Sequence, residues 1–386
     1  MKPKSILHIA SYYSGQRLYR NLIFSLNRHD IAQYVFVPVR SKEEVGKFQI
    51  NDVDNVGFYY ANILKPYHRF FYYTKIRRSF SALQQGVDLS RIGFVHAHSL
   101  FSDGGVALKV KRKFNIPYIV AVRNTDLNVF FKLMPHLRQF GLKILLEAES
   151  VVFINPSYKE QLLERYVPDI YKDVIRQKSI CIPNGVDDFW HINPGTPKVF
   201  KGEVGRLAIL YVGSFIPRKN VPLVINMALE LNKRYDVTLT IVGGGGNGKV
   251  QKEDKTTRYA IELASKAGLS IELAGRVEDL SQLRLYYQSN DIFVMPSYGE
   301  TFGLVYIEAL TQGTPIIYAA NEGVDGFFYD GQVGRAIHKF SVDELVHAVE
   351  FVLEDYKNIS KRCLHATYDY QWRVISKQYL ALYKIL

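Results

Sequence analysis

Two glutamates lie eight positions apart in the segment PSYGETFGLVYIEALTQGTPII, residues 296–317. Glu300 follows a glycine in a turn, and Glu308 lies in an apolar stretch that has the pattern of a buried helix. A carboxylate in apolar surroundings is costly unless a partner or a ligand satisfies it. Eight helical residues span about 12 Å, which matches a sugar joined through a diphosphate to a ribose. On the alternative interpretation, Glu300 is only a helix N-terminal charge and Glu308 pairs with a nearby Lys or Arg.

Glycines surround the first of these acids and recur in other loops. Gly299 and Gly303 bracket the start of the expected helix, where free backbone N–H groups and the helix dipole favour anions. The run from Gly243 to Gly246, with Gly248, also satisfies G-x-G-x-x-G. A dinucleotide-binding dehydrogenase is therefore an alternative, but that fingerprint opens an apolar helix directly, whereas the charged stretch KVQKEDKTTRY follows here.

The elements that must position these residues alternate along the whole chain. Short β-branched runs such as SILHIAS, YIVAVR and LAILYVG are followed by amphipathic helical patterns, which predicts an α/β fold with parallel sheets covered on both faces. The segment PNGVDDFWHINPGTPKVFKGE separates two such blocks. We predict two doubly wound, Rossmann-like domains, 1–190 and 191–370, and a C-terminal helix over 371–386 that packs back toward the first domain. Ligands of such sheets bind at the carboxyl ends of the strands.

Five motifs in a fixed order resemble one known family. They are IPNGVD (182–187), YVGSFIPRKN (211–220), TIVGGGG (240–246), LAGRV (273–277) and PSYGETFGLVYIEALTQGTPII. Together they are similar to the retaining glycosyltransferases of family four, also called glycosyl transferases group 1. The resemblance covers the second half strongly and the first half more loosely. It implies the GT-B fold, in which two Rossmann-like domains face each other across a cleft.

The resemblance also implies a role for each matching residue. Glu300 would contact the donor sugar, Glu308 would accept the ribose hydroxyls, and Lys219 would neutralise the diphosphate as it leaves. The implied donor-binding residues are Gly15, Gly213, Ser214, Arg218, Gly243, Arg276, Val277, Phe302, Gly303, Leu304 and Glu308.

The chain departs from the family pattern at three places. Ser214 stands where the family often has Arg, and Asn220 replaces the usual Gly after the lysine, so Arg218 is an alternative second cation; it is also consistent with an ordinary surface charge. The segment RNTD (123–126) lacks the His that many members have there. We nevertheless expect Arg123 and Asp126 to contact the sugar or the acceptor, and we count them with Glu300 and Lys219 as catalytic candidates.

Basic charge is concentrated in the first half of the chain. Residues 1–190 hold 27 Lys and Arg against 16 Asp and Glu, whereas the remainder holds 22 against 21. The stretch KPYHRFFYYTKIRRSF (65–80) interleaves six aromatic with five basic residues, and KVKRKF (109–114) adds charge. This composition fits an anionic membrane surface or, alternatively, a core helix with a solvated basic face. Nothing resembles a nucleic-acid module, so we expect no nucleic-acid partner.

The remaining features limit the cofactor and the compartment. His96 and His98 point to one face of a strand end, but no further ligand at metal-binding spacing follows them, so we expect no metal and no other cofactor. The chain has two cysteines, Cys181 and Cys363, and the N-terminal apolar run is about five residues long. We therefore expect a cytoplasmic enzyme, peripheral on the membrane.

The predicted activity is retaining, metal-independent transfer of a sugar from a nucleotide diphosphate donor, UDP- or GDP-linked. The acceptor would be a glycan hydroxyl, lipid-linked, in surface polysaccharide synthesis. Two alternatives stay open: a non-catalytic GT-B scaffold that binds lipid or polysaccharide, and a GT-B phosphorylase or epimerase, for which no pyridoxal-phosphate lysine motif is seen.

Overall fold

The computed structural model describes residues 5–15, 17–51, 53–200, 205–244 and 255–383. The chain forms two compact units, one made of residues 1–185 and 372–386 and the other of residues 186–371. The sequence predicted the boundary at residue 190 and a separate segment from residue 371. In the structure the chain leaves the first unit after Gly185 and returns to it at Trp372.

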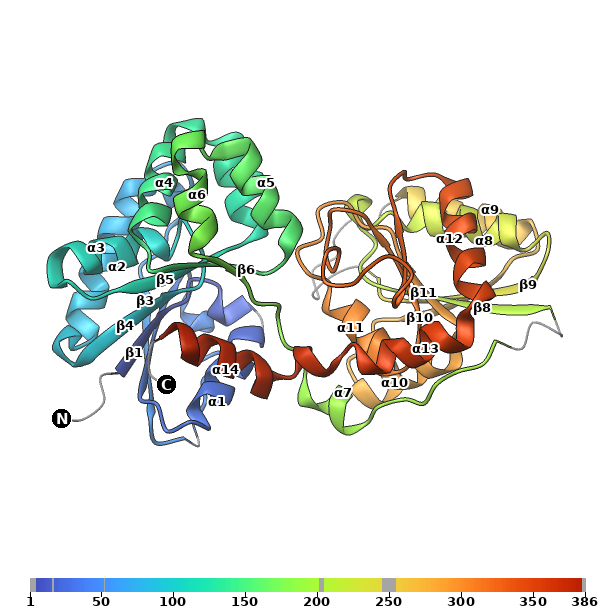
Figure 1. The fold of residues 1–386 in the computed structure, drawn as a ribbon, viewed down its shortest axis with the longest axis horizontal. Helices are drawn as coiled ribbons and strands as arrows, with labels where there is room; N and C mark the ends of the chain where they lie inside the picture. Colours follow the sequence, from blue (N-terminus) through green and yellow to red (C-terminus); the bar gives the residue numbers. More distant parts are fainter. Residues whose placement is uncertain (1–4, 16, 52, 201–204, 245–254, 384–386) are drawn as a thin grey trace. The chain divides into compact units, whose positions relative to one another are not determined.

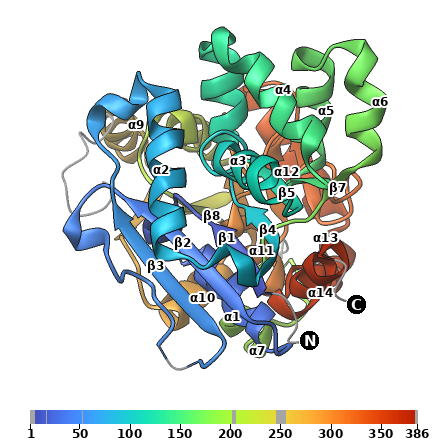
Figure 2. The same cartoon turned by 90° about the vertical axis from the view of Figure 1, so that its left-hand side faces the viewer.

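The first unit contains a seven-stranded parallel sheet in the order β3-β2-β1-β4-β5-β6-β7. Figure 2 shows β3, β2 and β1 side by side at one edge. The strands are β1 (Ser5–Ile9), β2 (Gln33–Val39), β3 (Val56–Asn62), β4 (Ile92–Ala97), β5 (Tyr118–Val122), β6 (Ser150–Phe153) and β7 (Ser179–Cys181).

Helices cover both faces of this sheet (Figure 1). Leu7 and Ile9 of β1 pack with α2, α3 and α4, whereas Ile6 packs with α1 and α14, because successive strand residues point to opposite faces. The C-terminal helix α14 therefore completes the core of the first unit. The helices are α1 (Leu18–Asn27), α2 (Tyr72–Gly86), α3 (Gly104–Phe114), α4 (Arg138–Glu147), α5 (Pro156–Tyr166), α6 (Asp169–Gln177) and α14 (Trp372–Leu382).

The second unit contains a six-stranded parallel sheet in the order β10-β9-β8-β11-β12-β13. One large apolar core holds this sheet and its helices together. The strands are β8 (Arg206–Val212), β9 (Asp236–Val242), β10 (Ser270–Gly275), β11 (Ile292–Met295), β12 (Ile316–Ala319) and β13 (Gly334–Ile337). The helices are α7 (Asp188–Ile192), α8 (Val221–Leu231), α9 (Lys255–Lys266), α10 (Leu280–Ser289), α11 (Leu304–Thr311), α12 (Val342–Glu354) and α13 (Tyr356–His365).

The prediction of two doubly wound parallel-sheet domains is confirmed. In each sheet the strand order reverses beside one strand: β1 lies between β2 and β4, and β8 lies between β9 and β11. The loops that leave the two strands at such a point diverge, and ligands of open α/β sheets bind there. Among the described residues, no helix has both the length and the apolar character needed to cross a membrane.

Candidate functional site

Three strand-end glycines lie against one another at the carboxyl edge of the second sheet. The Gly213 N–H donates to the Val242 carbonyl at 2.9 Å, and the Gly243 N–H donates to the Gly275 carbonyl at 2.7 Å. Gly243 has φ +134°, and a Cβ placed on it would lie 1.9 Å from the Gly213 carbonyl oxygen. Only glycine fits there, so the predicted strand-end glycines Gly213 and Gly243 do come together. Gly245, Gly246 and Gly248 lie outside the described residues.

Lys219 and Glu300 form a nearly buried ion pair beside these glycines. Lys219 ends the 3-10 turn Pro217–Lys219 after β8, and Glu300 lies in the loop after β11. Because β8 and β11 are neighbours in the sheet, the Lys219 ammonium reaches Glu300 Oε2. The side chains are each only 11% exposed. Glu300 Oε1 also accepts the Thr301 N–H at 3.0 Å. The sequence suggested that Glu300 was either a sugar contact or a helix-start charge, and the structure pairs it with Lys219, another of the predicted catalytic residues.

Backbone hydrogen bonds fix the two loops that carry this pair. The Tyr298 N–H donates to the Arg218 carbonyl at 2.7 Å, and the Ser214 carbonyl accepts the Tyr211 hydroxyl at 3.2 Å. The Arg218 side chain is exposed next to Lys219. The structure thus places a second cation at this edge, at the position where the sequence suggested a substitute for the family's arginine.

The start of α11 offers backbone N–H groups to the same edge. Gly303, with φ +74°, is the N-cap of the helix, and no side chain caps it. A Cβ on Gly303 would lie 2.5 Å from the Tyr306 ring. Phe302 is buried against Phe327 and Tyr370, so its contribution is its backbone, and Leu304 is the first helical residue. The first N–H groups of a helix have no intrahelical partner.

Glu308 lies on the side of α11 that faces α10. Its Oε2 accepts the Tyr287 hydroxyl at 3.1 Å. Burial raises the pKa of Glu308 to about 7, although the tyrosine hydrogen bond acts in the opposite direction and Asp187 adds to the rise. The alternative interpretation, in which Glu308 pairs with a Lys or Arg, is not supported, because the one protein hydrogen bond of its carboxylate among the described residues comes from Tyr287.

Two further predicted donor residues follow β10. Arg276 forms an ion pair with Glu278 at 2.9 Å, and Val277 packs against the core of the second unit. Both residues follow β10, which is the neighbour of β9, and lie at the same carboxyl edge of the sheet.

Sequence reasoning missed Glu322, which follows β12. Its carboxylate accepts the backbone N–H groups of Gly299 and Glu300, so it holds the turn that carries Glu300. Burial raises the pKa of Glu322 to about 7, because its effect is larger than the opposing effect of these hydrogen bonds. Oε2 of Glu322 is buried and has no partner among the described residues. The available signal was an acid between Asn321 and Gly323, in a turn directly after a strand.

The predicted residues of the first unit have contrasting environments. Arg123 donates from Nε to the His98 carbonyl at 3.0 Å and lies over the Tyr19 ring. Asp126 is 1% exposed and accepts the backbone N–H groups of Leu100, Phe101 and Arg123 at 2.9 to 3.1 Å. Its carboxylate therefore joins the loops after β4 and β5, and we assign it a positioning role in place of the expected ligand contact. Gly15 is exposed, has no positive φ, and would tolerate a Cβ.

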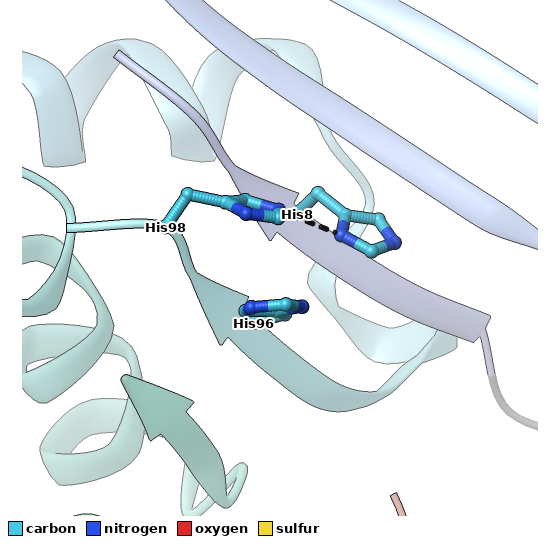
Figure 3. A group of neighbouring side chains, drawn as sticks. All are labelled: His8, His96 and His98. Carbon is cyan, nitrogen blue, oxygen red and sulfur yellow. Dashed lines mark hydrogen bonds between the residues drawn. The ribbon is translucent and has the colours of Figure 1, made fainter. Parts of the chain in front are cut away.

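His96 and His98 do have a third histidine beside them, His8 of β1 (Figure 3). His8 and His96 are paired across β1 and β4, so both point to the same face of the sheet. The sequence search looked only after His98 and missed this earlier residue. Its signal was a polar side chain inside the apolar run SILHIAS.

Hydrogen bonds define how these imidazoles are used. The Gln33 amide N–H donates to the Ile23 carbonyl, so its Oε1 accepts from His8 Nε2 at 3.1 Å. His8 Nδ1 is then an acceptor, and His98 Nε2 donates to it at 3.0 Å. Burial lowers the pKa of all three histidines, and neighbouring Arg123 lowers those of His96 and His98 further. His8 and His98 thus form a neutral hydrogen-bonded chain with Gln33, and His96 Nδ1 forms a separate hydrogen bond with the Tyr383 hydroxyl at 2.8 Å.

Comparison with known proteins finds a family that matches the second unit. Residues 197–368 match the family described as glycosyl transferases group 1. A D-inositol 3-phosphate glycosyltransferase of Nocardia farcinica is 27% identical over 286 residues, which cover 70% of this chain and 61% of that protein. The chain thus spans less than two thirds of that relative's length.

Solved structures extend the likeness of fold to the whole chain. Sucrose-phosphate synthase from Thermosynechococcus elongatus superposes with a TM-score of 0.74 at 18% identity, over 99% of this chain and 98% of that one. Alr3699/HepE of Anabaena, in complex with UDP, gives a TM-score of 0.70 at 14% identity, over 99% and 100%. These likenesses show the fold, which is GT-B.

Proposed function

Because residues 197–368 match the glycosyl transferases group 1 family, we propose that this chain is a retaining glycosyltransferase that uses a nucleotide diphosphate sugar. UDP- and GDP-sugars are the donors that we expect, and the acceptor is a glycan hydroxyl, lipid-linked, in surface polysaccharide synthesis. Arg123 would contact the sugar or the acceptor in the first unit.

One observation carries this proposal: Lys219 and Glu300 meet at the point where the strand order of the second sheet reverses. A buried ion pair contributes little to stability on average, so stability alone does not explain a pair at the ligand-binding edge of the sheet. The two groups match the two ends of an activated sugar. An ammonium suits the diphosphate, and a carboxylate suits the sugar hydroxyls.

The chemistry that follows is stabilisation of the leaving group. As the bond between the anomeric carbon and the phosphate oxygen breaks, negative charge grows on the diphosphate. The Lys219 ammonium and the N–H groups at the start of α11 would offset that charge in a site of low dielectric. The acceptor hydroxyl would attack from the same face and lose its proton to the departing phosphate, which retains the configuration and requires no metal.

Glu308 would fix the other end of the donor. Its carboxylate has one tyrosine partner and keeps acceptor positions for two ribose hydroxyls. Arg276 and Val277 would lie beside the base, which backbone groups would contact.

We also propose that the first unit attaches to the cytoplasmic face of an anionic membrane. Phe70 and Phe71, at the start of α2, are 84% and 62% exposed, beside Arg69. Exposed aromatic rings next to basic residues are suited to the level of the lipid headgroups. The alternative from the sequence, a core helix with a solvated face, applies to Tyr72 and Ile76, which are buried on the other side of the helix.

The direct test is incubation of the full chain with UDP-, GDP- and ADP-sugars, with chromatography to follow release of the nucleoside diphosphate. We expect release from one donor, increased by a lipid-linked glycan, and NMR should find the donor's anomeric configuration in the product. Binding of the donor without release or transfer under any of these conditions would favour the non-catalytic scaffold.

A further inference from the structure

A pocket of the first unit lies at the carboxyl edge of its sheet. The pocket has a volume of about 690 Å³. Its walls come from the loops that follow five consecutive strands, with Tyr12 after β1, Arg40 after β2, Leu64 after β3, Ser102 after β4 and Thr125 after β5. This is the edge at which open parallel sheets bind ligands, and we call it the β-edge pocket.

Four cationic side chains line the β-edge pocket. They are Arg40, Lys65, Arg69 and Lys75. No carboxylate lines the pocket, and the structure shows none of these four side chains in an ion pair with any residue that it describes. Like charges that have no ion-pair partner repel one another, and an anion bound between them would relieve that repulsion.

Lys75 is the inner cation of the four. Its Nζ donates to Ser102 Oγ at 2.6 Å, which leaves two of its three N–H donors without a protein acceptor among the described residues. Burial lowers the pKa of Lys75, and Asp103 and Asp126, which lie behind the pocket, oppose that shift. Both acids are themselves occupied, Asp103 by Ser11 and Ser99 and Asp126 by backbone N–H groups. The ammonium therefore has unused donors on the pocket side.

His68 supplies a second, independent sign of a ligand. The residue is only 6% exposed, and its Nδ1 accepts the Lys65 backbone N–H at 3.0 Å. In the neutral ring the proton must then be on Nε2, which is a donor. Nε2 is buried and has no hydrogen-bond partner in the structure, and the residue lines the β-edge pocket. A buried donor without an acceptor is costly, so His68 would gain a hydrogen bond if its ring turned Nε2 toward an anion in the pocket.

Part of the lining of the β-edge pocket is apolar. Leu64, Val129, Phe130 and Met134 form it. The pocket therefore combines a cationic end that carries hydrogen-bond donors with a surface for carbon atoms.

We infer that the β-edge pocket binds the phosphate group of a phosphorylated acceptor, with the rest of that molecule against the apolar lining. The identification of the bound molecule as an acceptor rests on the proposed function, but the binding of a phosphate group does not. A phosphate ester carries up to two negative charges and three acceptor oxygens, which several cations and the His68 donor can share. A carboxylate would leave more of these groups unused.

A second groove in the same unit provides a matched control. It lies between α2 and α3, has a volume of about 540 Å³, and is also lined by basic and aromatic residues. Its Arg112 is already paired with Glu147, and Lys109 and Lys113 lie over the Phe80 ring. Charge alone would attract an anion to either groove, whereas a site that depends on the Lys75 ammonium would bind it in the β-edge pocket.

The test is calorimetric titration of the full chain with octyl phosphate, glucose 6-phosphate and octyl glucoside. We expect one octyl phosphate or glucose 6-phosphate to bind per chain, and octyl glucoside to bind at least tenfold more weakly. Tighter binding of octyl phosphate would identify a lipid phosphate, and tighter binding of glucose 6-phosphate a soluble one; both outcomes support a phosphate site.

Two variants decide whether the β-edge pocket is the site. Lys75→Met keeps the length of the side chain and should weaken phosphate binding by about 10- to 100-fold, because it removes a charged donor. The Lys109→Gln/Lys113→Gln variant, which removes more charge from the other groove, should bind as the parent does. Equal weakening by the two variants, or no phosphate binding by the parent chain, would overturn the inference. Neither result requires a donor or turnover, so failure here is distinguishable from failure of the proposed glycosyl transfer.

Discussion

In the second unit, the lysine and the glutamate that follow β8 and β11 are paired with each other, whereas the basic residues that follow β2 and β3 in the first unit have no carboxylate partner among the described residues. The two sheets are otherwise built alike, parallel and reversing beside their first strand. Lys219 and Glu300 are neutral as a pair, so they can be held nearly buried and fixed in position. The cations of the β-edge pocket mostly lie exposed and can attract an anion from a distance.

The buried acids of the two units differ in the same way. Asp126 uses both carboxylate oxygens on three backbone N–H groups, and Glu308 has one tyrosine partner. An acid whose oxygens are all used holds loops together, and an acid with unused acceptor positions can meet a ligand. Burial alone therefore does not separate a positioning carboxylate from a binding one, but the count of its hydrogen bonds does.

The largest effect should come from Glu300→Gln. This change removes the charge that pairs with Lys219 and that would hold the sugar hydroxyls, and we expect the turnover of donor to fall by at least about 100-fold. Release of nucleoside diphosphate under donor saturation measures it. Arg218→Gln, which removes an exposed cation in the adjacent loop, is the comparison, and its turnover of donor should fall by less than about tenfold. Near-parent turnover in Glu300→Gln would contradict its assigned role.

Membrane attachment should depend on the first unit alone. Phe70→Ser/Phe71→Ser removes two exposed rings, and we expect binding to liposomes that contain anionic lipid to weaken by at least about tenfold, since burial of one such ring is worth about 1.5–3 kcal/mol. Sedimentation at low salt measures it. Ile170→Ser/Val174→Ser removes two exposed apolar residues of α6 in the same unit and should leave binding unchanged. Similar losses in both variants would contradict a localised membrane surface.

Asp126→Asn should reduce stability more than chemistry. An amide cannot accept all three backbone N–H groups, so at least one is left unsatisfied, at a cost of about 1–3 kcal/mol. The melting temperature of the first unit should fall by several degrees, while the affinity for a nucleoside diphosphate stays at the parent value. A lower turnover with an unchanged melting temperature would instead support the ligand contact of Asp126 that the sequence suggested.

The smallest effect concerns the pH dependence of nucleotide binding. The pKa of Glu308 is raised by burial to about 7, so the carboxylate ionises between pH 6 and 8 and only then accepts two ribose hydroxyls. Relative to Glu308→Gln, the parent's affinity for a nucleoside diphosphate should rise by about threefold to tenfold over that range. The variant corrects for titration of the ligand itself, and parallel pH profiles would reject the ribose contact.

Stability should change in the opposite direction for the same residue. The folded-state pKa lies above the ordinary value of 4.5, so the unfolded chain loses the Glu308 proton first as pH rises. The contribution of this group to stability is present below pH 4.5 and is lost as pH rises to about 7. In Glu308→Gln, this loss of stability between pH 4.5 and about 7 should be absent.

The fold was predictable because each strand and helix carries its own pattern. The segment GGVALKVKRKF forms α3. The amphipathic pattern that follows SILHIAS includes Leu18 to Asn27, which form α1. Short edge elements were not foreseen: β7 has three residues, and no alternating pattern marks it. Glycine positions were predictable for a physical reason as well, since a Cβ on Gly243 would meet the Gly213 carbonyl of the neighbouring strand end and one on Gly213 would meet the Tyr211 hydroxyl.

The partners of the site residues were not predictable from one sequence. Lys219 and Glu300 were both expected at the donor site, but their ion pair depends on β8 and β11 being neighbours across a crossover. His8 joins His96 and His98 only because β1 lies beside β4, although 88 positions separate His8 from His96. His68 gives no sequence signal at all, because its role depends on which ring nitrogen the Lys65 backbone N–H uses.

Calorimetric titration of a nucleoside diphosphate into the Lys219→Met/Glu300→Gln variant tests the central claim most directly. Removing both partners of a buried ion pair leaves no isolated charge, so the variant should stay folded, as its melting temperature will show. If these two side chains hold the donor, the parent should bind UDP or GDP at one site and the folded variant at least about 100-fold more weakly. Equal affinities in the two proteins would contradict the account.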